Sequence, residues 1–445
     1  MTGKGKKCLW SGPAAVVLTA LSGPAFAQDS GGLNANLSFS QGLVSSSEDG
    51  TYGQTNLGFT LSNVTPVQDL QFEISTGLEE QLSGGFDAEI VDPALSLSYG
   101  IENRQSALDI SAKYARSDVD SFTESDDPLS SVLVLDTGTR ESSGVSLGYT
   151  FGREKLFGGA FSTSYNTTSY SGTTDTDLVD VERIGAGLDL RFEITPRIAA
   201  TLGYNFSDTN RTGDGLDVRS TDVQAGVDLT VSETLNAAVS VGFDTVTSTD
   251  STGATEQEDG FVFAFNLSQD RPNGALSFNL NSTVTETGRR SDVSVANTFE
   301  TRKGGEFSGS VGLTVDDNGN TNPLYAVSFS ESLRRSSYSV YLNQNITSND
   351  LGEDALNTRV GADYTHVLTA TTEFQTGLDY QATDYQGNSD DTSRFDISLG
   401  ISHELTQDWS VSSRYTYSVE NEDGQARDTD SRLFVGLETN FGWRP

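Results

Sequence analysis

The chain has 445 residues, 63 of them acidic and 27 basic, so its formal net charge is −36 at pH 7. A chain this acidic repels nucleic-acid phosphates, which leaves nucleic-acid binding all but excluded. Its mean hydropathy of −0.37, with no long apolar run beyond the N-terminus, excludes a bundle of transmembrane helices. A transmembrane β-barrel is compatible with both values, because its apolar residues alternate with polar ones.

The N-terminal segment has the features of a secretory signal. Residues 1–27 combine a basic start, an apolar stretch at 14–21 and the small-x-small triplet at 25–27 that precedes signal-peptidase cleavage. The sequence therefore predicts export, with a mature chain that starts at Gln28; an uncleaved interfacial or membrane helix is the alternative. The single cysteine, Cys8, lies in this leader, so the mature protein would have neither disulfides nor thiolate metal sites.

Beyond the leader, apolar and polar residues alternate with period two, as in strands whose successive side chains point to opposite faces. The pattern is clear at 183–194, 222–231, 235–244 and 394–401. Such segments run for about 9 to 14 residues, longer than the usual strand and close to the length that a tilted strand needs to cross a bilayer. They predict an all-β fold, an antiparallel transmembrane β-barrel.

The connections between these segments alternate in kind. Ten short turns are expected, at 65–66, 102–105, 152–155, 195–197, 232–234, 271–274, 302–305, 332–337, 369–372 and 406–408. Longer acidic loops are expected at 46–50, 118–127, 173–180, 209–217, 248–260, 350–354, 385–391 and 420–430. Short periplasmic turns with longer extracellular loops are typical of outer-membrane barrels, and these turns predict about 22 strands, with 16 to 22 possible. The pattern is weakest at 288–336, where 293–301 is taken as a strand, and residues 28–445 are expected to form one barrel domain.

The last strand carries a further signal. Leu437, Phe441 and Trp443 lie on one face of a segment that alternates to the end of the chain. This closing strand resembles the insertion signal of Gram-negative outer-membrane β-barrel proteins, which the barrel-assembly machinery reads. It departs from the usual pattern because Arg444 and Pro445 follow the aromatic. The resemblance implies a location in the outer membrane, in contact with lipid and lipopolysaccharide.

Two of the short turns support a narrower resemblance. The Thr-Pro-Arg turn at 195–197 and the Ser-Glu-Thr turn at 232–234 look like those of a group of β-barrel porins, some of which are linked to polysaccharide export. This resemblance implies a porin-like barrel.

Charged residues on the polar side of the strands are the candidates for the lining of a lumen. They are Glu73, Asp109, Lys113, Asp189, Arg191, Glu193, Asp228, Asp363, Asp379, Asp396, Arg414 and Glu438. Charges facing lipid are costly, so this side must meet water or form ion pairs. If acids outnumber bases in the lumen as they do in this set, the pore should prefer cations. The alternative is that these groups pair with one another and stabilise a closed barrel.

Little in the sequence points to an enzyme or to a cofactor. Two histidines, His366 and His403, lie near expected short turns. Ser and Asp are so abundant that the presence of all three residue types is no evidence for a Ser-His-Asp triad. The stretch 316–320 has some oxygen ligands of a calcium loop but lacks the terminal glutamate of an EF-hand, so a plain turn is expected. We expect no catalytic residue, no metal site and no cofactor.

Three functions remain open at this point, ahead of an outer-membrane hydrolase, for which the sequence offers no active-site constellation. The first is an outer-membrane channel for passive or substrate-selective passage of small hydrophilic solutes, with a cation-preferring lumen. The second is a structural or export-system barrel, for example for an exported polymer, without constitutive channel activity. The third is a soluble secreted β-sandwich or adhesin. The sequence does not specify an oligomeric state.

Overall fold

The computed structural model describes most of the chain after the N-terminal segment. The described residues are 32–47, 50–82, 88–119, 135–174, 178–213, 215–301, 304–317, 319–348, 354–385 and 391–443. The predicted signal at 1–27 lies outside them. No helix among these residues is long and apolar enough to cross a membrane.

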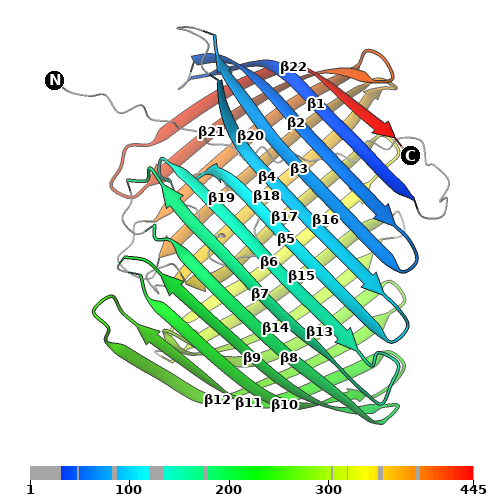
Figure 1. The fold of residues 1–445 in the computed structure, drawn as a ribbon, viewed down its shortest axis with the longest axis vertical. Coiled ribbons are helices and arrows are strands. Elements are labelled where there is room, and N and C mark those ends of the chain that lie inside the picture. The colour runs from blue at the N-terminus through cyan, green and yellow to red at the C-terminus, as the bar shows by residue number, and fades with distance from the viewer. Residues whose placement is uncertain are drawn as a thin grey trace.

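The described residues form one sheet of 22 antiparallel strands (Figure 1). The strands are β1 (Leu33–Ser46), β2 (Gly50–Val64), β3 (Gln68–Gln81), β4 (Ala88–Glu102), β5 (Ser106–Asp118), β6 (Thr139–Phe151), β7 (Phe157–Ser171), β8 (Val181–Thr195), β9 (Ile198–Arg211), β10 (Asp217–Thr230), β11 (Leu235–Thr249), β12 (Thr255–Arg271), β13 (Gly274–Thr285), β14 (Gly288–Glu300), β15 (Gly305–Asp316), β16 (Thr321–Ser332), β17 (Ser336–Ser348), β18 (Asp354–Thr369), β19 (Thr372–Tyr385), β20 (Thr392–Glu404), β21 (Trp409–Glu422) and β22 (Asp428–Trp443). The weak stretch at 293–301 falls almost entirely in β14, as expected.

Each strand pairs with its neighbours in the chain, and the first strand pairs with the last. In this closing pair, Ala35 of β1 lies opposite Trp443 of β22, and Leu43 lies opposite Val435. A sheet whose end strands pair in this way has no open edge. The predicted closed antiparallel barrel of about 22 strands is thus confirmed. With strands about 4.8 Å apart and tilted by about 40°, such a barrel is about 45 Å across between opposite backbones.

The two ends of the barrel differ in their connections. The ten turns predicted from the sequence all join an even-numbered strand to the next odd-numbered one, so they lie at one end, called here the turn end. The other connections lie at the loop end. Several expected loops are shorter than predicted, because β12 already begins at Thr255, β9 continues to Arg211 and β22 begins at Asp428. These strand ends are polar on both faces, so alternation does not mark them although the backbone ladder continues.

The two faces of the sheet are chemically unlike. The face that carries Leu37, Phe161 and Val311 is apolar and exposed. On the polar face, the Tyr341 hydroxyl of β17 reaches over Gly361 of β18 and donates a hydrogen bond to Asp379 of β19. Side chains from alternate strands converge in this way on the concave side of a curved sheet. The polar face is therefore the inner face, and the apolar face is the outer one.

Aromatic rings of the outer face contact one another along and between strands near the turn end. The rings in these contacts are Phe59, Phe72 and Trp443, then Tyr149, Phe151, Phe157 and Phe192, then Phe299 with Phe307, and Phe329 with Tyr338. Their centroids lie 4.8 to 6.3 Å apart, the range of favourable aromatic pairs. The outer face thus has an aromatic belt at this end.

Buried side chains concentrate close to the loop end of the barrel. They include Val44, Tyr52, Thr168, Val181, Thr209, Arg211, Asp244, Val246, Val262, Val284, Thr314, Ala355, Asn357, Gln381, Thr383, Arg394 and Ser418. A wide barrel with an empty interior would leave inner side chains accessible along its whole length. Side chains therefore fill the interior near the loops more than elsewhere.

Candidate functional site: the barrel interior

Strand register decides which sequence-predicted residues share the interior. It places all twelve charged candidates on the inner face: Glu73, Asp109, Lys113, Asp189, Arg191, Glu193, Asp228, Asp363, Asp379, Asp396, Arg414 and Glu438. They do not form one cluster, because they are spread over nine strands of the barrel. The interior is therefore a long polar lining and not a compact active site.

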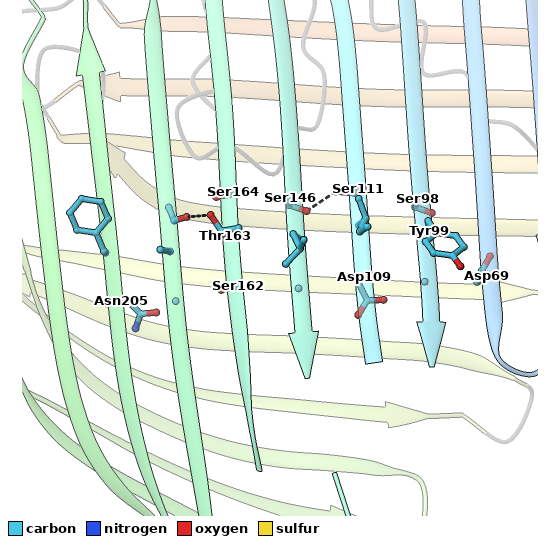
Figure 2. A pocket seen from close by; sticks show the side chains of 18 residues that line it. Asp69, Ser98, Tyr99, Asp109, Ser111, Ser146, Ser162, Thr163, Ser164 and Asn205 are labelled. Atoms are coloured by element: carbon cyan, nitrogen blue, oxygen red, sulfur yellow. Dashed lines mark hydrogen bonds between the residues drawn. The ribbon is translucent and has the colours of Figure 1, made fainter. Parts of the chain in front are cut away.

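The wall from β3 to β12 is lined by small polar residues. In one register row, Ser98, Ser111, Ser146 and Ser164 face each other on successive strands. Figure 2 shows this part of the wall, where the hydroxyls of Ser111 and Ser146 are 2.7 Å apart. Small side chains leave two depressions here, of about 620 and 510 Å³, which adjoin at Asn205. This wall offers hydroxyls and carboxylates to a hydrated solute.

The wall from β17 to β22 is held by ion pairs. Arg359 Nε lies 3.2 Å from Asp379, and Arg394 lies 2.9 Å from Asp396 and 3.2 Å from Glu420. The Arg394 side chain is only 3% exposed. Two of the predicted lining acids, Asp379 and Asp396, are thus neutralised locally. Both alternatives for the charged lining therefore hold in part. Some of the predicted acids form ion pairs, while others, such as Asp109 and Asp363, remain exposed to the interior.

Near the loop end, β13 separates from β12 and the β13–β14 hairpin folds inward, while β14 stays paired with β15 as far as Arg290. β13 pairs with β12 only as far as Ser282, which lies opposite Phe263, so residues 255–262 of β12 pair with β11 alone. Beyond that point the Val284 N–H donates a 3.2 Å hydrogen bond to Asp244 of β11. Val284 also packs on Val246 and Val262, side chains of the inner face. The hairpin end therefore lies over the inner face of β11 and β12.

Charged residues from distant strands meet at this hairpin end. Arg290 of β14 forms a 2.6 Å ion pair with Asp354 of β18, and these side chains are 12% and 10% exposed. Glu286, at the tip, is within electrostatic range of Arg183 and Arg211, which come from β8 and β9. We call these five residues the mouth cluster. Because β9 and β18 lie on nearly opposite sides of a 22-strand ring, the mouth cluster spans the interior.

The electrostatics of the mouth cluster are dominated by burial. Burial raises the pKa of the Glu286 carboxyl, against the lowering effect of Arg211, Arg183 and Arg290, while Asp354 adds to the rise. Arg211 is itself buried, and its Nη1 donates a hydrogen bond to the Leu216 carbonyl. Ionised groups held out of water in this way are costly unless they pair. Removing one charge of the cluster should therefore destabilise the others.

The expected absence of catalytic chemistry concerns three places. His366 and His403 lie at the turn end, where their Nδ1 atoms contact the hydroxyls of Tyr364 and Thr372. At 316–320, the Asp316 carboxylate accepts hydrogen bonds from the backbone and side-chain amides of Asn320, which is a turn interaction. Among the described residues, no group of three or more His, Cys, Asp or Glu side chains could hold a metal.

The arginines of the mouth cluster are not among the candidates that the sequence predicts. Arg183 and Arg290 are the third residues of β8 and β14, and Arg211 is the last of β9. Their position on the polar face next to a loop could have been read from the alternation. Their meeting with Glu286 could not, because it depends on the inward fold of one hairpin.

The comparisons with known proteins concern the fold alone. No family model and no curated protein matches this chain. Among solved structures, it is similar to the FrpB iron transporter of Neisseria meningitidis, with 8% identity, a TM-score of 0.60, and 93% of this chain and 83% of that one covered. It is also similar to the ferric-catecholate import receptor Fiu of E. coli K12, with 8% identity, a TM-score of 0.58 and 93% and 82% covered. A third is the siderophore receptor PirA of Acinetobacter baumannii, with 9% identity, a TM-score of 0.55 and 92% and 80% covered.

Proposed function

We propose that this protein is an outer-membrane β-barrel that moves hydrophilic solutes through its interior, and that its mouth at the loop end is closed in the conformation described here. Of the two kinds of channel expected from the sequence, we propose the substrate-selective one and not a permanently open passive pore. The mouth cluster is the observation behind this choice: an ion pair ties the inward hairpin to β18, and Glu286 at its tip lies within electrostatic range of arginines of β8 and β9.

The outer face supports the membrane location. Strands of 12 to 17 residues, tilted by about 40°, rise about 30 Å or more, which is the thickness of the hydrocarbon core. The aromatic belt at the turn end fits the interface between hydrocarbon and water. The proposal includes export by the signal at 1–27 and recognition of Leu437, Phe441 and Trp443 by the barrel-assembly machinery, with outer-membrane lipid and lipopolysaccharide around the barrel.

The interior supports transport of polar cargo. The wall from β3 to β12 exposes Ser hydroxyls and carboxylates such as Asp109 to a wide lumen. Rings of carboxylates favour cations, so the open state should prefer them. The similar structures are named as iron transporters and siderophore receptors, which favours selective uptake over free diffusion. The proposal includes no catalytic step and no cofactor.

Export of a polymer is the second candidate function. A lumen about 45 Å across between backbones is wider than small solutes need, and a closed mouth fits a barrel that a partner opens. Loss of an exported polymer on deletion of the gene would favour export over uptake.

Reconstitution in a planar bilayer tests the main proposal. We expect the purified barrel to remain closed most of the time, with rare large openings whose reversal potential in a salt gradient shows cation preference. Steady conductance from the moment of insertion would refute the closed mouth. Anion preference would refute the acidic lumen, and partition of the native protein into water without detergent would refute the membrane location.

A further inference from the structure

We propose that the end of the β13–β14 hairpin, residues 283–290, is a hinged gate that alternates between the inward position described here and a straight position in the barrel wall. This inference rests on the proposed transport function and says which segment regulates it. It follows from two features of the same segment: an alternative place in the wall that is already built, and a set of contacts that keep it away from that place.

The alternative place is the unpaired side of β12. Residues 255–262 of β12 pair with β11 on one side, while β13 stops pairing with β12 at Ser282. Continuing the same register would place Thr283 opposite Val262 and Val284 opposite Phe261. The hairpin could thus extend an existing ladder without any shift, and each added pair would satisfy backbone groups of β12.

The sequence of β13 fits this straight position. Leu276, Phe278 and Leu280 point to the outer face, because they lie opposite the outer-face residues Gln269, Leu267 and Phe265 of β12. Val284 has the same parity, so a straight β13 would place it on the outer face beside Phe261. In the inward position it packs on the inner face instead, against Val246 and Val262. The same side chain has an apolar surface to cover in either position, as a two-state element requires.

The inward position is held mainly by polar contacts. The Arg290–Asp354 pair joins the hairpin to β18, and the Val284 N–H donates its 3.2 Å hydrogen bond to Asp244 of β11. At the tip, Gly288 has a φ of +107°, a conformation that suits glycine and lets the hairpin turn sharply. Because a buried pair loses its stability when one partner is removed, neutralising Asp354 should release the gate.

Two disulfides that share one cysteine test the two positions. Val262→Cys/Val284→Cys joins side chains that touch in the inward position, and Phe261→Cys/Val284→Cys joins residues that would be directly opposite in the straight position. Phe261 points to the outer face, so the second pair cannot form while the hairpin lies on the inner face. The chain offers a clean background, since its single cysteine, Cys8, can be replaced.

We expect both disulfides to form in membrane-embedded protein under mild oxidation. The Phe261→Cys/Val284→Cys yield should rise several-fold when Asp354→Asn is added, and stay unchanged with Asp379→Asn, which breaks an ion pair between the adjacent strands β18 and β19. In a bilayer, the 262–284 disulfide should abolish openings until it is reduced, and the 261–284 disulfide should keep the channel open.

The outcomes separate the gate from the proposed function. Complete formation of the 262–284 disulfide with no 261–284 disulfide, even with Asp354→Asn, would overturn the gate. Equal conductance of the two oxidised proteins would also overturn it. Formation of both disulfides without conductance in any state would leave the moving hairpin in place and refute the transport function.

Discussion

Arg394 tests whether the inner wall depends on neutralising its buried acids. Its side chain is 3% exposed and lies between Asp396, at 2.9 Å, and Glu420, at 3.2 Å. Replacement by Met keeps most of the volume and removes the charge. Two acids that are only 13% and 18% exposed then face each other without a cation. Removing one partner of a buried ion pair costs about 3–5 kcal/mol, so Arg394→Met should lower the free energy of unfolding by about that amount.

The assay measures equilibrium unfolding of the barrel by urea, in detergent or in lipid vesicles. The folded fraction is read from the heat-dependent mobility of the protein on a gel. Arg414→Met is the matched control, because Arg414 lies on the same wall with an exposed side chain; its change should stay within about 0.5 kcal/mol.

A triple variant separates charge from packing. Arg394→Met/Asp396→Leu/Glu420→Leu removes all three charges and should cost less than the single change, since no uncompensated charge remains. Two results would contradict a stabilising role for Arg394 between its two acids. One is unfolding of Arg394→Met and Arg414→Met at the same urea concentration, and the other is a triple variant that is the least stable of the three.

Three further predictions concern gating, selectivity and assembly. Burial raises the pKa of Glu286 in the inward position, so that position binds the proton more tightly than a solvated tip would. Falling pH should therefore favour closure and rising pH opening, in a range that begins near the ordinary pKa of a glutamate and extends above it. Glu286→Gln should abolish this dependence in single-channel records. Asp109→Asn/Asp363→Asn removes two exposed lining acids, so the reversal potential in a salt gradient should move toward zero. An unchanged reversal potential would contradict cation selection by the acidic lumen. Trp443→Ala removes a ring that lies 6.1 Å from Phe59, which should cost about 1–3 kcal/mol and lower the yield of folded barrel in outer-membrane fractions.

Much of the architecture could be predicted because period-two alternation is a local signal. Segments such as 235–244 define both a strand and its two faces without reference to any other segment. The same signal is missing at 255–260, where Glu256, Glu258 and Asp259 make both faces polar: the sequence predicts a loop there, and the structure has the start of β12. In the proposed membrane location, contact with lipid requires the alternation only across the apolar zone, so strand ends beyond that zone lose it.

The interior could be predicted only as a face. Parity assigns Asp379 and Asp396 to the polar side but does not show that they are neutralised. Arg359 reaches Asp379 from the neighbouring strand β18, whereas Arg394 lies two residues before Asp396 on β20 itself. The inward position of the hairpin could not be predicted from the sequence at all. Val284 continues the outer-face series of β13, so the sequence pattern indicates the straight position and not the one found.

The seam between β1 and β22 has a consequence for how the barrel is made. Pairings within the sheet otherwise join strands that are consecutive in the chain, and the seam joins residues about 400 positions apart, such as Ala35 and Trp443. Closing a loop of that length costs about 5 kcal/mol of chain entropy, which the final strand must recover in one step. Until β22 has paired with β1, every partly formed sheet has two open edges able to pair with another chain. The last hairpin to be made therefore decides between a finished barrel and an aggregate.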